Sequence, residues 1–186
     1  LRERMNSEGG VELPLDEAQA IAILREMDRL QVQAIAVSLL WSIANPAHEI
    51  RIGELIAEHL PGVPYSLSHQ TSPTIREYRR TSATAIDASL KPLVGRTIKE
   101  LESRLRAAGL EGVLTLMTSS GGQTAVDEVL ARPINLCLSG PSAAPESARS
   151  TIRAEGEQTC NAIVVDMGGT SFDISIVDNW QVPMHR

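Results

Sequence analysis

The stretch AIVVDMGGTSFDIS at residues 162–175 constrains the fold more strongly than any other part of this chain. A run of β-branched residues ends at Asp166, and a second run, in which apolar and polar residues alternate, follows around Asp173. Parallel strands need a long crossover connection, whereas only a short turn separates these two runs. The sequence therefore predicts an antiparallel hairpin. Its turn consists of Gly168, Gly169, Thr170 and Ser171.

This turn has two interpretations. Glycine tolerates positive φ, so the two glycines can serve the geometry of the hairpin alone. Alternatively, successive N–H groups can form a concave anion site, to which the two hydroxyl residues add donors for phosphate oxygens. Asp166 can then hold a magnesium ion through water, and Asp173 can orient the turn. The turn is not a P-loop, because no Lys follows its glycines and a strand replaces the expected helix.

The rest of the chain alternates short apolar runs with amphipathic segments, which predicts α/β architecture. Asp16 with Gln19 forms a predicted capping box, Asn45 a predicted N-cap, and Pro92 a predicted kink. Thr124 with Asp127 is expected to cap a short helix. The other helices are expected over about 17–30, 46–60, 72–108 and 142–152, and strands over 33–41, 63–67, 113–117 and 134–138.

Composition excludes several classes of function. The net charge of −6 offers no basic stripe to nucleic acid. The longest apolar run, residues 34–44, is too short to span a bilayer. Cys137 and Cys160 lie in apolar runs, where buried reduced thiols are typical of a cytoplasmic protein. We therefore expect a cytoplasmic protein that binds neither nucleic acid nor membranes.

The hairpin resembles the phosphate-binding hairpin of the sugar kinase, actin and heat-shock ATPase superfamily. Other segments are similar, in order and spacing, to the hydantoinase A and 5-oxoprolinase family, which includes N-methylhydantoinases and acetone and acetophenone carboxylase subunits. These segments are LLWSIANPAHEIRIGELIAEHLPG, SPTIREYRRTSATAIDASLKPLV and LMTSSGGQTAVDEVLARPINLCLSGPSAAP. The resemblance covers nearly the whole chain from about residue 8.

The resemblance implies an α/β fold with ribonuclease H-like, actin-like ATPase elements and a long connecting helical region. Two lobes would enclose ATP. Residues 1–138 would form the C-terminal part of the first lobe with its connecting helices, and residues 139–186 would begin the second lobe. Proteins of this family are several times longer, so we expect an internal fragment, with the glycine hairpin of the first lobe upstream of Leu1.

The resemblance also implies ATP and Mg²⁺ as cofactors, with Asp166 as the metal ligand. The implied nucleotide-binding residues are Asp166, Gly168, Gly169, Thr170, Ser171 and Asp173. Further cleft candidates are Ser120, Gly121, Gly122, Gly140, Glu77, Arg80 and Thr81. Each has a structural alternative, because TSSGG can be a plain strand-to-helix loop, SGP a capping turn, and REYRRTSAT a bridge between helices. His69 is a loop histidine or a base, and no catalytic residue stands out.

By this resemblance the chain is part of an ATP-dependent hydrolase that opens a cyclic amide of hydantoin or 5-oxoproline type after phosphoryl activation of its carbonyl oxygen. An ATP-dependent ketone carboxylase subunit and a non-catalytic nucleotide-binding scaffold are the alternatives. The expected partners are a small cyclic amide or ketone and a second subunit or further copies of the protein. The fragment alone is expected to be inactive.

Overall fold

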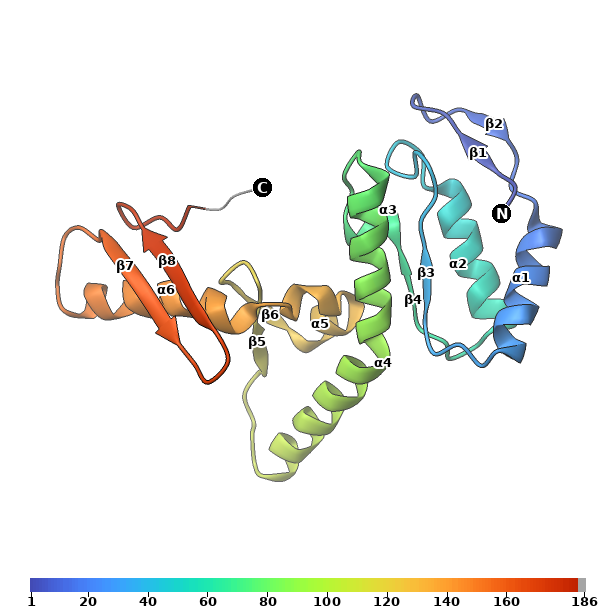
Figure 1. Cartoon of the computed structure of the whole chain (residues 1–186). Coiled ribbons are helices and arrows are strands. Elements are labelled where there is room, and N and C mark those ends of the chain that lie inside the picture. Colours follow the sequence, from blue (N-terminus) through green and yellow to red (C-terminus); the bar gives the residue numbers. More distant parts are fainter. Residues whose placement is uncertain (184–186) are drawn as a thin grey trace. The chain divides into compact units, whose positions relative to one another are not determined.

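The computed structural model describes residues 1–183 and contains two compact units (Figure 1). The first unit comprises residues 1–110 and 130–134, and the second comprises residues 111–129 together with the chain from residue 135 onward. Helices and strands occur in both units, and each sheet among the described residues has two strands. The predicted mixed α/β class is therefore confirmed. The predicted division between two lobes at residue 138 stays a prediction.

The first unit is built on a parallel βαβ motif. Strands β3 (Ile35–Val37) and β4 (Tyr65–Leu67) pair in parallel, and α2 (Ala47–His59) is the crossover between them. A small hairpin of β1 (Arg4–Met5) and β2 (Val11–Leu13) precedes α1 (Glu17–Arg29). After β4 come the short α3 (Ser68–Thr71) and the long α4 (Glu77–Ala107).

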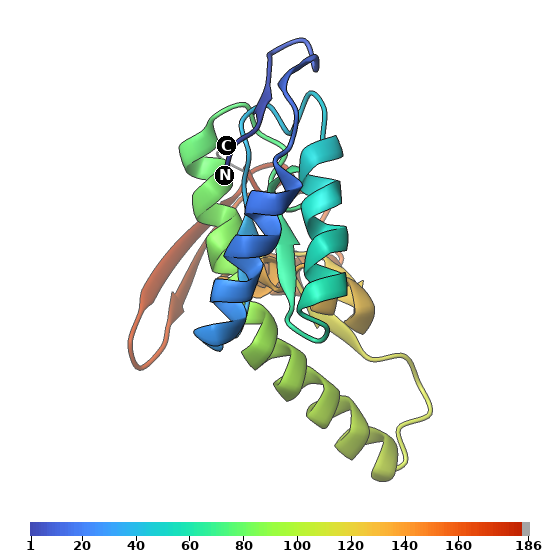
Figure 2. The ribbon, with the colours of Figure 1, turned by 90° about the vertical axis from the view of Figure 1, so that its right-hand side faces the viewer.

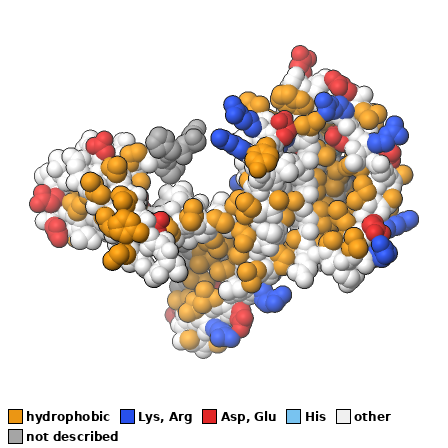
Figure 3. All heavy atoms as spheres, in the orientation of Figure 1, with side chains coloured by type: hydrophobic (Ala, Val, Ile, Leu, Met, Phe, Trp, Pro, Cys, Tyr) orange, Lys and Arg blue, Asp and Glu red, His pale blue; other side chains and the backbone are white. Residues whose placement is uncertain are grey.

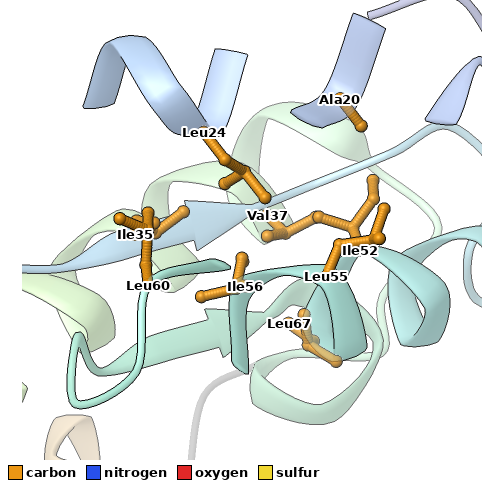
Figure 4. Close-up of a cluster of buried hydrophobic side chains, with 9 residues drawn as sticks. All are labelled: Ala20, Leu24, Ile35, Val37, Ile52, Leu55, Ile56, Leu60 and Leu67. Atoms are coloured by element: carbon orange, nitrogen blue, oxygen red, sulfur yellow. The ribbon is translucent and has the colours of Figure 1, made fainter. Parts of the chain in front are cut away.

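The core of this unit lies between the strand pair and the apolar faces of α1 and α2 (Figure 4). The i, i+3, i+4 spacing of apolar residues in α2 brings three buried side chains onto one helix face, as the sequence predicts. From the strands, Ile35 and Val37 of β3 and Leu67 of β4 pack against this helix face. The core residues are Ala20, Leu24, Ile35, Val37, Ile52, Leu55, Ile56, Leu60 and Leu67.

Local signals in the sequence set the starts of both helices. Asp16 accepts a hydrogen bond from Gln19 N at 2.9 Å, so the predicted cap of α1 is confirmed. The predicted reciprocal bond, from Asp16 N to the Gln19 side chain, is wrong, because Gln19 Oε1 accepts from Arg2 N instead. Asn45 Oδ1 accepts from Ala47 N at 3.0 Å, but the N-cap residue of α2 is Pro46, so the predicted N-cap at Asn45 is wrong by one position.

Helix α4 begins at Glu77, later than the predicted start at Ser72. Pro92 lies inside it, and the ribbon changes direction about half-way along (Figure 2). Proline lacks the N–H of a helical hydrogen bond and crowds the preceding turn, which explains the bend. Gly109 follows the helix with φ +96°, a conformation that favours glycine, and its predicted role as a C-cap residue is confirmed.

A buried polar network joins the carboxyl ends of β3 and β4 to α2 and α4. Arg80 is completely buried and donates to Ser68 Oγ, Thr74 O and Leu39 O at 2.7–3.0 Å. Ser68 Oγ in turn donates to Glu49 Oε1 at 2.6 Å, and Glu49 is also completely buried. One hydroxyl thus bridges a buried guanidinium and a buried carboxylate. This geometry favours the structural interpretation of Arg80 over a place in an open cleft.

The second unit contains two antiparallel hairpins. Strands β5 (Thr115–Met117) and β6 (Gln123–Ala125) form the first, followed by α5 (Val126–Ala131), which starts in this unit. Strands β7 (Ala162–Met167) and β8 (Phe172–Val177) form the second, which confirms the predicted hairpin. Helix α6 (Ser139–Ala154) packs against it.

Three local predictions in this region are wrong. Thr124 lies in β6 rather than at a helix cap, because Thr118 N donates to Gly122 O and closes a tight turn that returns the chain to β5. Residues 134–138 form no strand; a 3₁₀ turn spans Pro133–Leu136, where proline fixes φ and Ile134 N donates to Asp87 Oδ1. Cys137 is exposed, whereas Cys160 is buried as expected, and both thiols are free.

None of the helices within residues 1–183 combines the length and apolar character needed to cross a membrane.

We predict that Arg80→Ala lowers the free energy of unfolding of the first unit by about 3–5 kcal/mol, because it removes the buried guanidinium that faces the Glu49 charge through Ser68 and leaves two partly buried carbonyl groups without their donor. Urea denaturation measures the change. Arg79→Ala is the matched control, since the neighbouring Arg79 is exposed and should change stability by less than about 0.5 kcal/mol. Equal losses in both variants would contradict the role of the network.

Candidate functional site

The turn between β7 and β8 presents unused backbone donors. Gly168 N donates to Ser171 O at 3.0 Å and closes the turn. The amides of Gly169, Thr170 and Ser171 find no acceptor among residues 1–183, and all of these residues are exposed. Consecutive free N–H groups in a turn can bind an anion such as a phosphate. The turn therefore has the donors that the sequence predicts for phosphate binding.

The conformation of the turn does not require its glycines. Neither Gly168 nor Gly169 has φ in the left-handed region. A Cβ at Gly169 would meet nothing within 4 Å, and one at Gly168 would meet only Ser171 O at 4.0 Å. The purely geometric interpretation is thus disfavoured. The missing side chains leave space beside the free amides, which suits close approach of a ligand to the backbone.

Asp166 and Asp173 are direct cross-strand partners one pair away from the end of the ladder. Residues opposite each other in an antiparallel pair point to the same face, and like charges in this position are destabilising. Neither carboxylate forms an ion pair with Lys, Arg or His among residues 1–183. A cation between the two carboxylates would remove the repulsion.

The donor set fits magnesium bound together with a phosphate. Mg²⁺ is commonly held by one or two carboxylates, waters and substrate phosphates rather than by a complete cage of protein ligands. Within residues 1–183 there is no group of three or more His, Cys, Asp or Glu that could hold a metal. A metal at Asp166 and Asp173 would therefore complete its coordination with water and the ligand.

Alternation along the hairpin separates an exposed face of large apolar side chains from the face that carries the two carboxylates. Asp173 and Ser175 are half-buried, whereas the intervening large side chains are exposed. Hydrophobic side chains gather over this hairpin in the space-filling view (Figure 3). The exposed apolar residues are Ile163, Val165, Met167, Phe172, Ile174 and Ile176. The face that carries the two carboxylates is the opposite one.

A cavity of about 430 Å³ brings Asp173 together with two of the predicted cleft residues, Ser120 and Gly121. Ser142 Oγ in α6 donates to Ser119 O at 2.7 Å and holds the 118–122 loop against the helix. The cavity is lined by Ser119, Ser120, Gly121, Leu138, Pro141, Ser142, Pro145, Glu146, Arg149, Asp173, Ile174, Ser175 and Val182. Gly122 does not line it.

Gly140 and Asp166 line a separate hollow of about 610 Å³ along α6. Gly140 belongs to the first turn of this helix, which follows Leu138 at φ +60°, and not to a loop before the helix. The first turn of α6 thus shares one hollow with Asp166 through Gly140 and one cavity with Asp173 through Pro141. The partial positive charge at a helix N-terminus favours anions nearby.

The sequence analysis missed Glu146 and Arg149, which also line the cavity around Asp173. Arg149 Nη1 donates to both carboxylate oxygens of Glu146, at 2.7 and 2.9 Å, and Arg149 Nε is buried without a partner among the described residues. The sequence signal that could have identified this ion pair is the i, i+3 spacing of Glu146 and Arg149 in a predicted helix that follows a glycine turn.

The three cleft candidates from REYRRTSAT belong to the first unit. Glu77 is half-buried at the start of α4, and Thr81 is exposed, with its Oγ1 at 2.8 Å from Ser38 Oγ. Arg80 belongs to the buried network described above. Their proposed contact with a nucleotide stays a prediction.

Comparison with known proteins identifies the family to which the chain belongs. A model of the hydantoinase/oxoprolinase family matches residues 80–185, and a model of the hydantoinase/oxoprolinase N-terminal region matches residues 1–60. The alpha subunit of caprolactamase from Pseudomonas jessenii is 38% identical, covering 93% of this chain and 25% of that protein. The gamma subunit of acetophenone carboxylase from Aromatoleum aromaticum is 37% identical, covering 95% of this chain and 24% of that protein.

Solved structures resemble the chain as well. The crystal structure of the ATP-dependent caprolactamase from Pseudomonas jessenii matches with a TM-score of 0.85 at 38% identity, over 95% of this chain and 25% of that one. Nucleotide-free acetone carboxylase matches with a TM-score of 0.78 at 24% identity, over 96% of this chain and 25% of that one, which supports the fold alone. The chain spans about a quarter of the length of these relatives.

We predict that Gly121→Ala destabilises the second unit by roughly 1–3 kcal/mol. Gly121 has φ +80°, and an added Cβ would lie 3.1 Å from Glu146 Cγ. Gly122→Ala is the control, because its Cβ would meet Thr118 Oγ1 at an ordinary 3.7 Å and its φ is not left-handed, so the loss should stay below about 1 kcal/mol. Chemical denaturation compares the two, and an equal effect would refute the packing of Gly121 on Glu146.

Proposed function

Because the chain belongs to the hydantoinase/oxoprolinase family, we propose that it is the part of an ATP-dependent enzyme that binds the phosphates of Mg²⁺-ATP at the β7–β8 turn. The observation that carries this proposal is the turn itself. Three of its four amides are free, its glycines serve neither backbone conformation nor packing, and two opposed carboxylates stand beside it. ATP dependence is named for the caprolactamase that resembles this chain.

In this proposal the free amides and the hydroxyls of Thr170 and Ser171 contact phosphate oxygens, and Asp166 holds the magnesium ion with Asp173 opposite. The metal would neutralise charge on the phosphates. The protein would contribute positioning and fixed donors, which are the main protein contributions in phosphoryl transfer. The cavity at Ser120, Gly121 and Asp173 adjoins this region and would take part of the ligand.

The reaction we propose is opening of a cyclic amide. Resonance protects the amide carbonyl, and transfer of the γ-phosphoryl group to its oxygen activates the carbon. Water then adds to that carbon, the ring C–N bond breaks with a proton going to nitrogen, and a second water hydrolyses the resulting acyl phosphate. Two waters and one ATP are consumed for each ring. The similarity to caprolactamase supports this substrate class.

A ketone carboxylase is the second candidate, because the acetophenone carboxylase gamma subunit is 37% identical to this chain and caprolactamase is 38% identical. Because these two identities are nearly equal, they favour neither cyclic amide opening nor ketone carboxylation. Turnover of lactams and of ketones by the complete enzyme, scored for ATP consumption and bicarbonate dependence, decides between them. Binding of Mg²⁺-ATP without any turnover would favour a non-catalytic nucleotide-binding piece.

We also propose the finer architecture that the family resemblance implies. Residues 1–138 would belong to the first ribonuclease H-like lobe of an actin-like ATPase, and residues 139–186 would begin the second lobe. Relatives named as alpha and gamma subunits support a second subunit as partner. A cytoplasmic location stays a prediction.

We predict that Gly168→Ala combined with Gly169→Ala lowers the affinity of the enzyme for Mg²⁺-ATP at least tenfold, because the new methyl groups occupy the space beside the free amides. Isothermal titration measures the affinity. Gly95→Ala is the control, since Gly95 also has nothing near its missing Cβ but lies in α4. The ligand-free stability of the double variant should remain close to wild type, and unchanged nucleotide affinity would refute the proposed function.

We further predict that Asp166→Asn has opposite effects on stability and on binding. Without ligand, removal of one of two opposed charges should raise stability by about 0.2–1 kcal/mol. The stabilisation that Mg²⁺-ATP gives should fall, because the metal loses a carboxylate. Thermal denaturation with and without Mg²⁺-ATP measures both. A loss of stability without ligand, or full retention of the Mg²⁺-ATP effect, would contradict the metal site.

A further inference from the structure

The cavity of about 430 Å³ beside Asp173 lies entirely within the second unit, because every residue that lines it belongs to that unit. Its size is typical of pockets that bind small molecules. Asp173 also belongs to the proposed metal site, so a molecule in this cavity would lie next to the bound phosphates. A ring that receives a phosphoryl group from ATP must occupy such a place. The chemistry of the lining therefore decides which ring fits.

The walls of the cavity are largely apolar. Leu138 and Val182 line it, together with Pro141 and Pro145 of α6 and Ile174 of β8. Such walls make favourable contacts with the methylene groups of a small ring. Most ligand pockets combine apolar walls with a few convergent polar groups, which here are hydroxyls and charged side chains.

A second hollow in the same unit leaves room for the nucleotide. It has a volume of about 610 Å³ and contains Asp166. Asp166 lies opposite Asp173 in the ladder, so each hollow contains one member of the acidic pair. Phosphoryl transfer needs two ligands that meet at the metal. The larger hollow suits the nucleoside part of ATP, and the smaller cavity suits the γ-phosphoryl group and the ring that receives it.

Three charged side chains of the described residues line the smaller cavity, and together they are net negative. They are the carboxylates of Asp173 and Glu146 and the guanidinium of Arg149. Asp173 forms no ion pair with Lys, Arg or His among residues 1–183. Bound Mg²⁺-ATP would add negative charge, because the triphosphate carries more charge than the metal neutralises. A substrate carboxylate would therefore be repelled.

Glu146 already uses the positive charge of Arg149. Arg149 Nη1 donates to both carboxylate oxygens of Glu146, at 2.7 and 2.9 Å. Arg149 Nη2 makes no hydrogen bond among residues 1–183 and is not among the buried atoms that lack a partner, so it reaches solvent. Nη2 can donate to a neutral carbonyl group, but the paired guanidinium offers no uncompensated positive charge to a carboxylate.

We propose that this cavity takes a cyclic amide without a carboxylate, such as a lactam or a hydantoin, and that Glu146 sets this preference by neutralising Arg149. The inference rests on the proposed function and decides between the ring types that the sequence leaves open. 5-Oxoproline carries a carboxylate and would meet Asp173 and the phosphates without a free cation beside it. A neutral ring meets the apolar walls and the Nη2 donor instead.

Paired substrates test the preference in the complete enzyme. 5-Oxoproline and 5-oxoprolinamide have the same ring and nearly the same shape but differ in charge, and 2-pyrrolidone and caprolactam serve as unsubstituted rings. We expect kcat/KM, measured as ring-dependent ATP consumption, to be higher by about 10-fold or more for the best neutral ring than for 5-oxoproline. An equal or higher kcat/KM for 5-oxoproline would overturn the inference.

Glu146→Gln isolates the charge, because glutamine keeps the shape of the side chain and removes the counter-ion of Arg149. The kcat/KM for 5-oxoproline, relative to that for 5-oxoprolinamide, should rise by about 10-fold. Arg149→Gln should move this ratio in the opposite direction, because both carboxylates are then unneutralised. A loss of folded protein would affect both substrates equally. An unchanged ratio in both variants would therefore overturn the role of Glu146.

Glu155→Gln is the matched control. Glu155 directly follows α6, is exposed and does not line the cavity. The substitution removes the same charge from the same unit, so it should leave both kcat and the substrate ratio at their wild-type values. A shift in this control equal to that of Glu146→Gln would show a general charge effect and would overturn the role of Glu146.

The outcomes separate this inference from the proposed function. ATP consumption with 5-oxoproline as the best substrate would overturn the selection against charge and leave ATP-dependent ring opening intact. Absence of ATP consumption with every ring would instead contradict the proposed function, and the inference with it.

Discussion

The register of the β7–β8 ladder is the constraint on which the candidate site depends. Six consecutive antiparallel pairs place Asp166 opposite Asp173 and leave four residues for the turn. Side chains alternate between faces along a strand, so a slip by one residue would exchange the exposed apolar face with the face that carries the acidic pair. The same ladder therefore sets where the two charges meet and how far they lie from the free amides.

The sequence predicted features that depend on neighbouring residues. The hairpin needs only two strand-like runs and a short turn, and the side-chain bonds of Asp16 and Asn45 need only an oxygen near a free amide. These interactions span a few residues and depend little on distant partners, although the amide of Arg2 takes Gln19 Oε1 from the reciprocal bond of the capping box. The predicted turn contains Gly169, Thr170 and Ser171, whose amides are free. The sequence leaves the reason for its glycines open between geometry and ligand, because φ values depend on the folded backbone.

Features that depend on distant partners were not predictable. Arg79 and Arg80 are adjacent and chemically equal, yet only Arg80 is buried, because Ser68 Oγ and the Leu39 carbonyl meet it from other elements. The segment 134–138 has the composition of a strand, but the bond from Ile134 N to Asp87 uses its amide. The neighbouring sequence distinguishes neither Arg80 from Arg79 nor the segment 134–138 from a true strand. The place of Arg149 in the cavity likewise follows from the packing of α6 on β8.

The chemistry of the hairpin favours a particular kind of ligand. Free amides in the turn attract an anion, but two carboxylates in the adjoining ladder repel it. A free phosphate would therefore meet opposing electrostatic effects over a few ångströms. A phosphate that carries a divalent cation meets none, because the metal faces the carboxylates while the phosphate oxygens face the amides. The arrangement is thus better suited to a phosphate group together with its metal than to either alone, which makes the proposed magnesium site and the proposed phosphate site parts of one proposal.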